Sequence, residues 1–297
     1  MKEIIKRVLV SSKLLYLSYI NLKLVVSNFK FYKKTKSLKT EEVKNQQAVV
    51  SLVHRRKESK KSDVCHVIGS GWSLNESVSI IGKDDFVIGF NYAGLISIPF
   101  DVYFVEFGGF SVKNTSHQHV RITEDFVSKH TDLIFFKNLW EDKNDISFIN
   151  AHWLNLAMPI KDRIYPVFDK KYLDSVIEKM LSDQSEFLPQ SASSVVTAII
   201  LAYKAGFKKI VVHGLDFGGQ YFYEVDGFEV EKKYIPSSES ESGFYGKTTK
   251  KSVHPTSSGQ VGMKDIVPLL RKLLAPKGVE LCCATKSSPS SNFLPVA

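Results

Sequence analysis

Residues 69–74, with the sequence Gly-Ser-Gly-Trp-Ser-Leu, follow a short apolar run and combine residue types that bind anions. Glycines let backbone N–H groups approach a ligand closely, and the N-terminus of a following helix favours negative charge. The turn therefore predicts a nucleotide phosphate site formed by Gly69, Ser70, Gly71 and Ser73. A tight strand-to-helix turn that needs small residues would give the same pattern.

The surroundings of this turn narrow the class of nucleotide. The dinucleotide fingerprint requires a third glycine where this chain has Leu74, and the next predicted strand ends in Asn91 instead of an acidic ribose ligand. NAD is therefore disfavoured. A Gly-x-x-x-x-Gly-Lys-Ser/Thr run is also missing from the sequence, so an ATPase of the P-loop type is unsupported. Asn91 is predicted to hydrogen-bond a base or ribose, unless it caps the next helix.

A second polar cluster, residues 190–194 (Gln-Ser-Ala-Ser-Ser), precedes the apolar run 195–202. Serines at a helix start supply a cap and hydroxyl groups, and together with the free N–H groups they can hold a carboxylate or phosphate. Ser193 and Ser194 are therefore candidate ligands for a charged substrate. Most such clusters are only caps.

The motifs taken together resemble the small bacterial sialyltransferases that use CMP-sialic acid, and more distantly the CMP-Kdo transferases of lipopolysaccharide and capsule synthesis. In those enzymes a strand leads into Gly-x-Gly-x-Ser-Leu, as at residues 69–74. A Ser-initiated helix then leads through Gly-Tyr-Lys and an apolar strand to Gly-Ile-Asp-Phe, matched by Ser194, by 206–208 (Gly-Phe-Lys) and by 214–217 (Gly-Leu-Asp-Phe). The resemblance runs from about residue 64 to the C-terminus and leaves out the first 60 or so residues.

The resemblance implies a set of donor-binding residues. Gly69, Gly71 and Asn91 would contact the CMP moiety, and Ser193 and Ser194 would lie near the donor carboxylate or phosphate.

In the family a tyrosine directly follows the Asp-Phe pair and steadies the leaving phosphate. This chain has Asp216 in the matching motif but Gly218 where that tyrosine stands. The departure leaves the role to Tyr221, to Tyr223 or to neither.

Transfer of an ulosonic acid with inversion needs a base that deprotonates the acceptor hydroxyl, and histidine titrates in a suitable range. The resemblance implies His254, because the family places its base after a mobile lid and before the last helix. His213 ends a strand and is either a second polar contact or packed, whereas His66 lies mid-strand and is expected to be structural. His117 and His119 alternate like a surface strand or loop.

Metal chemistry is not indicated. The Asp-x-Asp signature of metal-dependent glycosyltransferases is absent from any convincing strand end, and Asp216 stands alone. We therefore expect a metal-independent reaction in which hydroxyl and basic groups stabilise the departing phosphate. No cofactor is expected beyond the CMP-activated sugar, which is the donor substrate.

Short apolar runs that alternate with helical patterns from residue 63 onward predict an α/β fold. We expect a Rossmann-like, mainly parallel sheet with helices on both faces, a sialyltransferase-like variant of the GT-A fold, with ligands at the carboxyl ends of its strands. The predicted strands are 64–68, 86–90, 102–105, 133–136, 209–213 and 279–283. The predicted helices are 171–181, 194–205 and 263–274, the last bent at Pro268.

The charge of the chain lies in its first 40 residues, which hold ten lysines and arginines against Glu3 and so carry the +9 of the whole chain. The remainder is balanced, which argues against nucleic acid as the main partner. The longest uncharged stretch, 14–22, is shorter than the 20 or so apolar residues that a bilayer span needs. A basic amphipathic helix on an anionic membrane surface is favoured, over a helix docked on its own domain or on a partner subunit.

These patterns divide the chain into a basic amphipathic membrane-associating segment (1–40), a linker with a possible short strand or helix (41–62) and a nucleotide-sugar-binding domain (63–297) with a lid at about 224–253. The expected partners are the CMP-sugar donor, a lipid-linked or surface glycan, an anionic membrane and a possible second copy of the chain. The expected location is cytoplasmic, peripheral on the inner face of the cytoplasmic membrane.

Three cysteines, Cys65, Cys282 and Cys283, show no metal spacing, and the adjacent pair cannot form an ordinary structural bridge, so a reducing compartment and buried thiols are expected.

Two other functions stay open. One is a nucleotide pyrophosphokinase or another nucleotide-dependent enzyme, and the other is a peripheral membrane scaffold with a Rossmann-like body.

Overall fold

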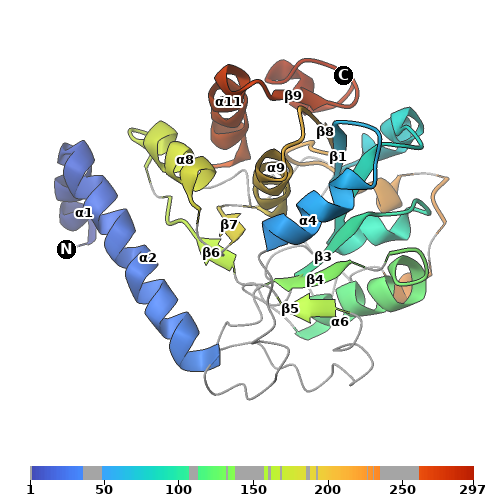
Figure 1. Ribbon diagram of the computed structural model, residues 1–297, viewed down its shortest axis with the longest axis horizontal. Helices are drawn as coiled ribbons and strands as arrows, with labels where there is room; N and C mark the ends of the chain where they lie inside the picture. The colour runs from blue at the N-terminus through green and yellow to red at the C-terminus, as the bar shows by residue number, and fades with distance from the viewer. Residues whose placement is uncertain are drawn as a thin grey trace.

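The computed structural model describes residues 2–35, 49–106, 113–131, 133–137, 157–159, 162–167, 169–184, 188–191, 193–225, 227–229, 231–234 and 261–297. Within these residues the chain forms one large sheet (Figure 1). Its strands are β1 (Val64–Ile68), β2 (Phe86–Phe90), β3 (Val102–Glu106), β4 (Ile134–Lys137), β5 (Ala157–Pro159), β8 (Lys209–His213) and β9 (Glu280–Cys283).

The sheet has the order β5-β4-β3-β2-β1-β8-β9, and all of its neighbouring strands pair in parallel. The chain thus builds one half of the sheet outward from β1 and then returns to the other side of β1 with β8. This reversal between β1 and β8 is the place where open α/β sheets bind ligands, at the carboxyl ends of the strands. A separate two-stranded parallel sheet is formed by β6 (Asp162–Ile164) and β7 (Leu188–Gln190).

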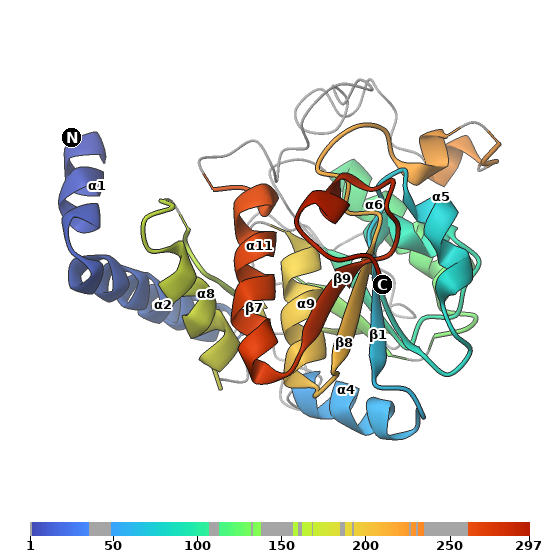
Figure 2. The same cartoon turned by 90° about the horizontal axis from the view of Figure 1, so that it is seen from above.

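Helices cover both faces of the large sheet, which confirms the predicted fold class. The α-helices are α1 (Lys2–Ser11), α2 (Lys13–Thr35), α4 (Val49–Glu58), α5 (Leu74–Ser77), α6 (Lys113–Ile122), α8 (Leu173–Ser182), α9 (Ser194–Lys204) and α11 (Met263–Leu274). Short turns are η1 (Val78–Ile80), η2 (Asn91–Leu95), the π-helical η3 (Thr123–Val127), η4 (Phe222–Glu224), η5 (Lys232–Tyr234), η6 (Ala275–Lys277) and η7 (Pro289–Asn292). Figure 2 shows α9 and α11 on one side of the strands, with α5 and α6 on the other.

The two faces follow from the alternation of side chains along each strand. Val67 and Ile88 point into the cluster that contains α8, α9 and α11, whereas their neighbours Ile68 and Val87 point into the cluster that contains α6 and η2. The strands are apolar on both sides because both sides are covered, as is typical of parallel sheets.

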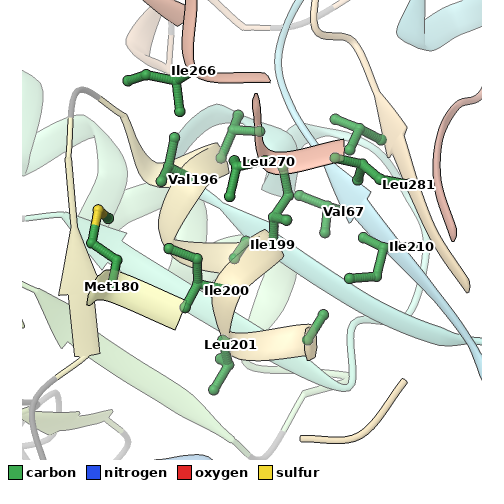
Figure 3. Packing of buried hydrophobic residues seen from close by; sticks show 14 of the residues in the cluster. Val67, Met180, Val196, Ile199, Ile200, Leu201, Ile210, Ile266, Leu270 and Leu281 are labelled. Atoms are coloured by element: carbon green, nitrogen blue, oxygen red, sulfur yellow. The ribbon is translucent and has the colours of Figure 1, made fainter. Parts of the chain in front are cut away.

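Helix α9 is the centre of the larger core. All of its residues from Ser194 to Ala202 are buried, and a helix that is apolar all round must be enclosed on every side. Figure 3 shows Ile199 and Ile200 of this helix meeting strand residues and the side chains of Met180 and Leu270 from α8 and α11. The sheet and two helices therefore fix the position of the start of α9.

Several predicted elements need correction. The strands β5, β6 and β7, three residues each, were missed, and α6 was not among the predicted helices. The second half of the predicted linker forms α4, whose Val49 and Val53 are buried in the core, so this part belongs to the domain. Most of the predicted lid, 224–253, lies outside the described residues. The three cysteines are free and buried, as predicted.

The basic N-terminal segment forms two helices. In the described part of the chain no single helix is long and apolar enough to cross a membrane; α1 and α2 meet the length and composition criteria only together, and they are bent by 115° at the break between them.

Candidate functional site at the carboxyl edge of the sheet

The glycine turn after β1 packs against the loop after β8. The N–H of Gly69 donates to the carbonyl of His213 at 2.9 Å, and the N–H of Gly71 donates to the carbonyl of Gly214 at 2.9 Å. A Cβ atom at Gly71 would lie 2.7 Å from that carbonyl oxygen, so only glycine allows the two loops to approach this closely. The expectation that these two amides face a phosphate is therefore corrected, because the neighbouring loop already uses them.

Asp216 lies at the centre of this contact and is buried. Its carboxylate accepts hydrogen bonds from the backbone N–H of Ser73 at 2.9 Å, from the Ser73 hydroxyl at 2.7 Å and from the Ser288 hydroxyl at 2.7 Å. The carboxylate thus takes the place at the start of α5 where the sequence predicts an anionic ligand. Asp216 and Ser73 hold three loops together, and a direct contact of either residue with a substrate stays a prediction.

Beside this contact, four polar side chains meet at the ends of β2, β3 and β4 and at the start of α9. Glu106 Oε2 accepts from Asn91 Nδ2 at 3.2 Å and from the Ser194 hydroxyl at 2.7 Å, while Asn91 Oδ1 accepts from the Glu106 N–H at 3.1 Å. Lys137 Nζ donates to Ser194 Oγ at 3.2 Å. The structure therefore joins Asn91 and Ser194, both predicted from the sequence, through two charged residues that were not. We call these four residues the polar cluster.

The electrostatics of the polar cluster keep its acid ionised. Burial would raise the pKa of Glu106, but the Lys137 ammonium and the hydrogen bonds from Ser194 and Asn91 together hold that pKa below its usual range. Lys137 is fully buried and Ser194 is buried, whereas Asn91 and Glu106 keep partial exposure. The cluster thus combines two partly exposed residues with an enclosed cation.

Backbone geometry fixes Asn91 in this position. Its φ is 53°, in the left-handed region that asparagine tolerates better than most residues. Its carbonyl accepts from the Tyr103 hydroxyl, which in turn accepts from the N–H of Gly94 at 3.0 Å. The side chain is therefore held by its own backbone as well as by Glu106.

Ser193 is the N-cap of α9, because its hydroxyl accepts from the N–H of Val195 at 3.1 Å. Ser193 therefore has the helix-capping role, which is one of the two roles expected of the serine cluster. The residue is also partly exposed. Ser194, one residue later, belongs to the polar cluster.

Tyr221 and Tyr223 form an aromatic pair near the glycine turn. Their rings stack at 5.2 Å with an interplanar angle of 9°, and the ring of Tyr92 lies 5.3 Å from that of Tyr223. The glycine turn holds their segment in place, since the N–H of Phe222 donates to the Ser70 carbonyl at 3.1 Å. Both predicted tyrosines therefore lie next to the turn, with their rings buried.

His119 was expected on a surface strand or loop, but it is buried on α6 behind Glu106. Its Nδ1 lies 3.4 Å from the Glu106 carbonyl oxygen, its ring meets that of Tyr92 edge to face at 4.7 Å, and among the described residues its Nε2 has no hydrogen-bond partner. Burial lowers the pKa of His119 to about 4. The ring is therefore neutral at physiological pH.

Two further histidines, His66 on β1 and His213 at the end of β8, form a buried pair. His66 Nδ1 lies 2.8 Å from His213 Nε2, the far nitrogen of His66 lies 3.0 Å from Asp85, and that of His213 lies 3.0 Å from the Ser77 hydroxyl. Burial, and then the neighbouring His66, lower the pKa of His213 to about 3, and burial lowers that of His66. Both nitrogens of each ring lie within hydrogen-bond distance of a group in the protein. The two histidines are therefore packed, structural residues.

The remaining predictions on the site are limited by the described residues. His254 lies outside them, and the side chain of His117 is not described, so the assignment of the base stays a prediction. Within the described ranges, no three metal-ligating side chains gather. Glu106 and Lys137 were missed, although a signal existed: each is the charged residue that directly follows an apolar strand run.

Comparisons with known proteins find structural likeness only. No protein-family model and no curated protein matches the chain. The α-2,3-sialyltransferase Cst-I from Campylobacter jejuni is 16% identical with a TM-score of 0.47, over 80% of this chain and 81% of that chain. The sialyltransferase CST-II, in complex with trisaccharide acceptor and CMP, is 16% identical with a TM-score of 0.46, over 79% of this chain and 86% of that chain. At these values the likeness assigns neither function nor ligand.

Proposed function

We propose that the chain is an inverting, metal-independent glycosyltransferase that moves an ulosonic acid, sialic acid-like or Kdo, from a CMP donor to a bacterial surface glycan. The observation that carries the proposal is the polar cluster. Asn91 and Ser194, which the motif resemblance assigns to the donor, are joined through Glu106 at the carboxyl edge of a parallel sheet.

The charges of the polar cluster suit a donor with two acidic groups. The phosphate and the sugar carboxylate of the donor are both anionic, and the buried ammonium of Lys137 at the start of α9 favours negative charge. The ionised carboxylate of Glu106 repels a second carboxylate. Because Lys137 is fully buried, its ammonium would offset the Glu106 charge without touching the donor, and the partly exposed Asn91 would supply the direct hydrogen bond.

The reaction itself needs a base and a stabilised leaving group. His254 would take the proton of the acceptor hydroxyl while the bond between the sugar and CMP breaks, which leaves the electron pair on the CMP phosphate. Tyr221 or Tyr223 would donate a hydrogen bond to that phosphate. The ring of Tyr223 lies 5.3 Å from that of Tyr92, the residue that follows Asn91 of the polar cluster, which supports this assignment.

Ligand binding by the full chain is the first test. CMP alone should raise the melting temperature, whereas AMP should not, and Asn91→Ala should reduce the shift. A screen of CMP-sialic acid and CMP-Kdo for hydrolysis, followed by mass spectrometry, then identifies the sugar. Indifference to CMP, CDP and CTP alike would refute the proposal.

A second variant separates the enzyme from its alternatives. His254→Ala should lose turnover and keep the thermal shift by CMP. A pyrophosphokinase would instead respond to ATP with magnesium, and a scaffold would show no turnover in the wild type.

A further inference from the structure

Helix α2 is apolar on two opposite faces, and only one of them is covered. Tyr16, Ile20 and Leu24 recur every fourth residue and are buried in the large core. The ring of Tyr16 lies 5.5 Å from that of Tyr172, next to α8. This face docks the helix on the body of the protein.

The opposite face points away from the protein. With about 100° between successive residues of a helix, its large apolar side chains centre about 180° from Ile20. Leu22 is 61%, Val25 is 63% and Phe29 is 71% exposed. The outer face of α2 consists of Leu14, Leu15, Leu22, Val25, Val26 and Phe29, and α1 adds Ile4, Ile5 and Val8.

This exposure is concentrated in the N-terminal helices. Of the twelve large apolar side chains that are exposed among the described residues, nine belong to α1 and α2. The three others, Ile80, Phe126 and Val296, come from separate parts of the body. Single exposed apolar residues need no explanation, whereas six of them on one face of α2 mark an interaction surface.

Charge identifies the partner of this surface. The first 40 residues hold ten basic side chains against one acidic, and Arg7, Lys13 and Lys23 are exposed on the same two helices. Lys6 instead lies 4.0 Å from Asp169, and Lys171 donates to the Val10 carbonyl at 3.1 Å, so α1 is also tied to the body. By the same angle Lys13 and Lys23 lie about 20° and 60° from Ile20, on the side of the helix that faces the protein, so the outer face itself is apolar. A segment that combines such a face with a strong net positive charge is the pattern of helices that lie in the surface of an anionic bilayer.

We propose that α1 and α2 form a membrane-docking platform: the outer face inserts into the surface of an anionic lipid bilayer while the face of Tyr16, Ile20 and Leu24 keeps the domain attached. The basic segment would thus combine both roles expected from the sequence: one face of α2 docks on the domain, and the other binds lipid. Figure 2 shows both helices at one end of the molecule, away from the carboxyl edge of β1 and β8. The docked enzyme would keep that edge open to a lipid-linked acceptor.

Co-sedimentation of the full chain with vesicles tests the platform. The protein should bind vesicles of phosphatidylglycerol and phosphatidylethanolamine at least about tenfold more tightly than vesicles of phosphatidylcholine, and salt should weaken this binding. The combined variant Leu22→Ser, Val25→Ser and Phe29→Ser should lose about tenfold or more in affinity. The matched control carries the same kind of change at Ile80, Phe126 and Val296, and it should bind as the wild type does.

A fluorescence measurement covers the case in which the combined variant is poorly folded. An environment-sensitive label on Val25→Cys should shift to the blue with anionic vesicles, whereas the same label on Val296→Cys should not. Equal vesicle binding by the wild type and the combined variant, or no shift at position 25, would overturn the proposal. Self-association in vesicle-free buffer that the combined variant abolishes would also overturn it, because the outer face would then be a protein interface. None of these outcomes depends on CMP binding.

Discussion

The buried neutral histidines make the fold sensitive to mild acid. The pKa of His213 is lowered to about 3 and that of His119 to about 4, against 6.5 in an unfolded chain. The unfolded chain therefore binds more protons than the folded chain below pH 6.5, and stability must fall as the pH falls. Full stability is present above about pH 7, and the loss continues down to the folded pKa values.

The size of this effect follows from linkage. Each histidine contributes a slope of about 1.4 kcal/mol per pH unit between its two pKa values, so moving from pH 7 to pH 5 costs about 2 kcal/mol for each and about 4 kcal/mol for the two together. This is a large part of the 5–15 kcal/mol typical of a domain. The pKa of His66 is lowered as well, which adds to the loss in the same direction.

Urea unfolding followed by circular dichroism at pH 7, 6 and 5 measures this loss. His119→Gln should reduce the slope of stability against pH by about 1.4 kcal/mol per unit, whereas the same change at the exposed His130 should leave it unchanged. His213→Gln gives a second measurement, although it also breaks the contact with His66. A free energy of unfolding that is equal at pH 7 and pH 5 would refute the assignment of buried, neutral rings.

Three further predictions test the remaining parts of the structure. Gly71→Ala should lower the melting temperature by roughly 5 °C or more, because the added Cβ would meet the Gly214 carbonyl. Ser70→Ala is the matched control, and equal melting temperatures of the two variants would contradict the loop contact. Ile20→Ala should cost about 2–5 kcal/mol in urea unfolding and Leu22→Ala under about 1, since only the first side chain is buried. Lys137→Met should weaken binding of the CMP donor about tenfold or more by calorimetry, and unchanged affinity would remove this residue from the site.

The sheet was predictable from the sequence because its strands carry a local signal. The bounds of β1, β2 and β8 agree with the prediction at both ends, and each of these five-residue strands consists mainly of apolar residues. The strands β5, β6 and β7 have three residues each, and two of them contain proline. Strands this short form because a neighbouring strand pairs with them, and three residues are too few to show a hydrophobic periodicity in the sequence.

Helix α4, expected only as a possible short helix, and helix α6, which was not predicted, show the same limit. Helix α4 buries only Val49 and Val53, and the basic run from Arg55 to Lys57 gives its end the composition of a linker. Helix α6 begins in a polar stretch, and its buried side chains Val120 and Ile122 lie near its end. In both helices, contacts with the body outweigh a weak local pattern.

The place of several candidate residues in the fold was predictable, but their contacts were not. Sequence patterns selected Gly71, Asn91 and Ser194, and the structure places all three at the carboxyl edge of the sheet. Which groups they meet depends on residues far along the chain. The N–H of Gly71 meets the Gly214 carbonyl, and Asn91 and Ser194 meet Glu106. Spacing in a sequence cannot show such partners, because loops from different strands come together only in the folded sheet.

The contact between the loops after β1 and β8 shifts the expected centre of the donor site. Because Asp216 occupies the start of α5 and Gly214 takes the N–H of Gly71, this corner is already satisfied and is rigid. The partly exposed Glu106 and the buried Lys137 lie on the other side, at the ends of β3 and β4. Lys137 offsets the charge of Glu106 there, and Asn91 stays partly exposed. If the proposed function holds, the donor would therefore be expected at the polar cluster, and the calorimetry of Lys137→Met tests this placement.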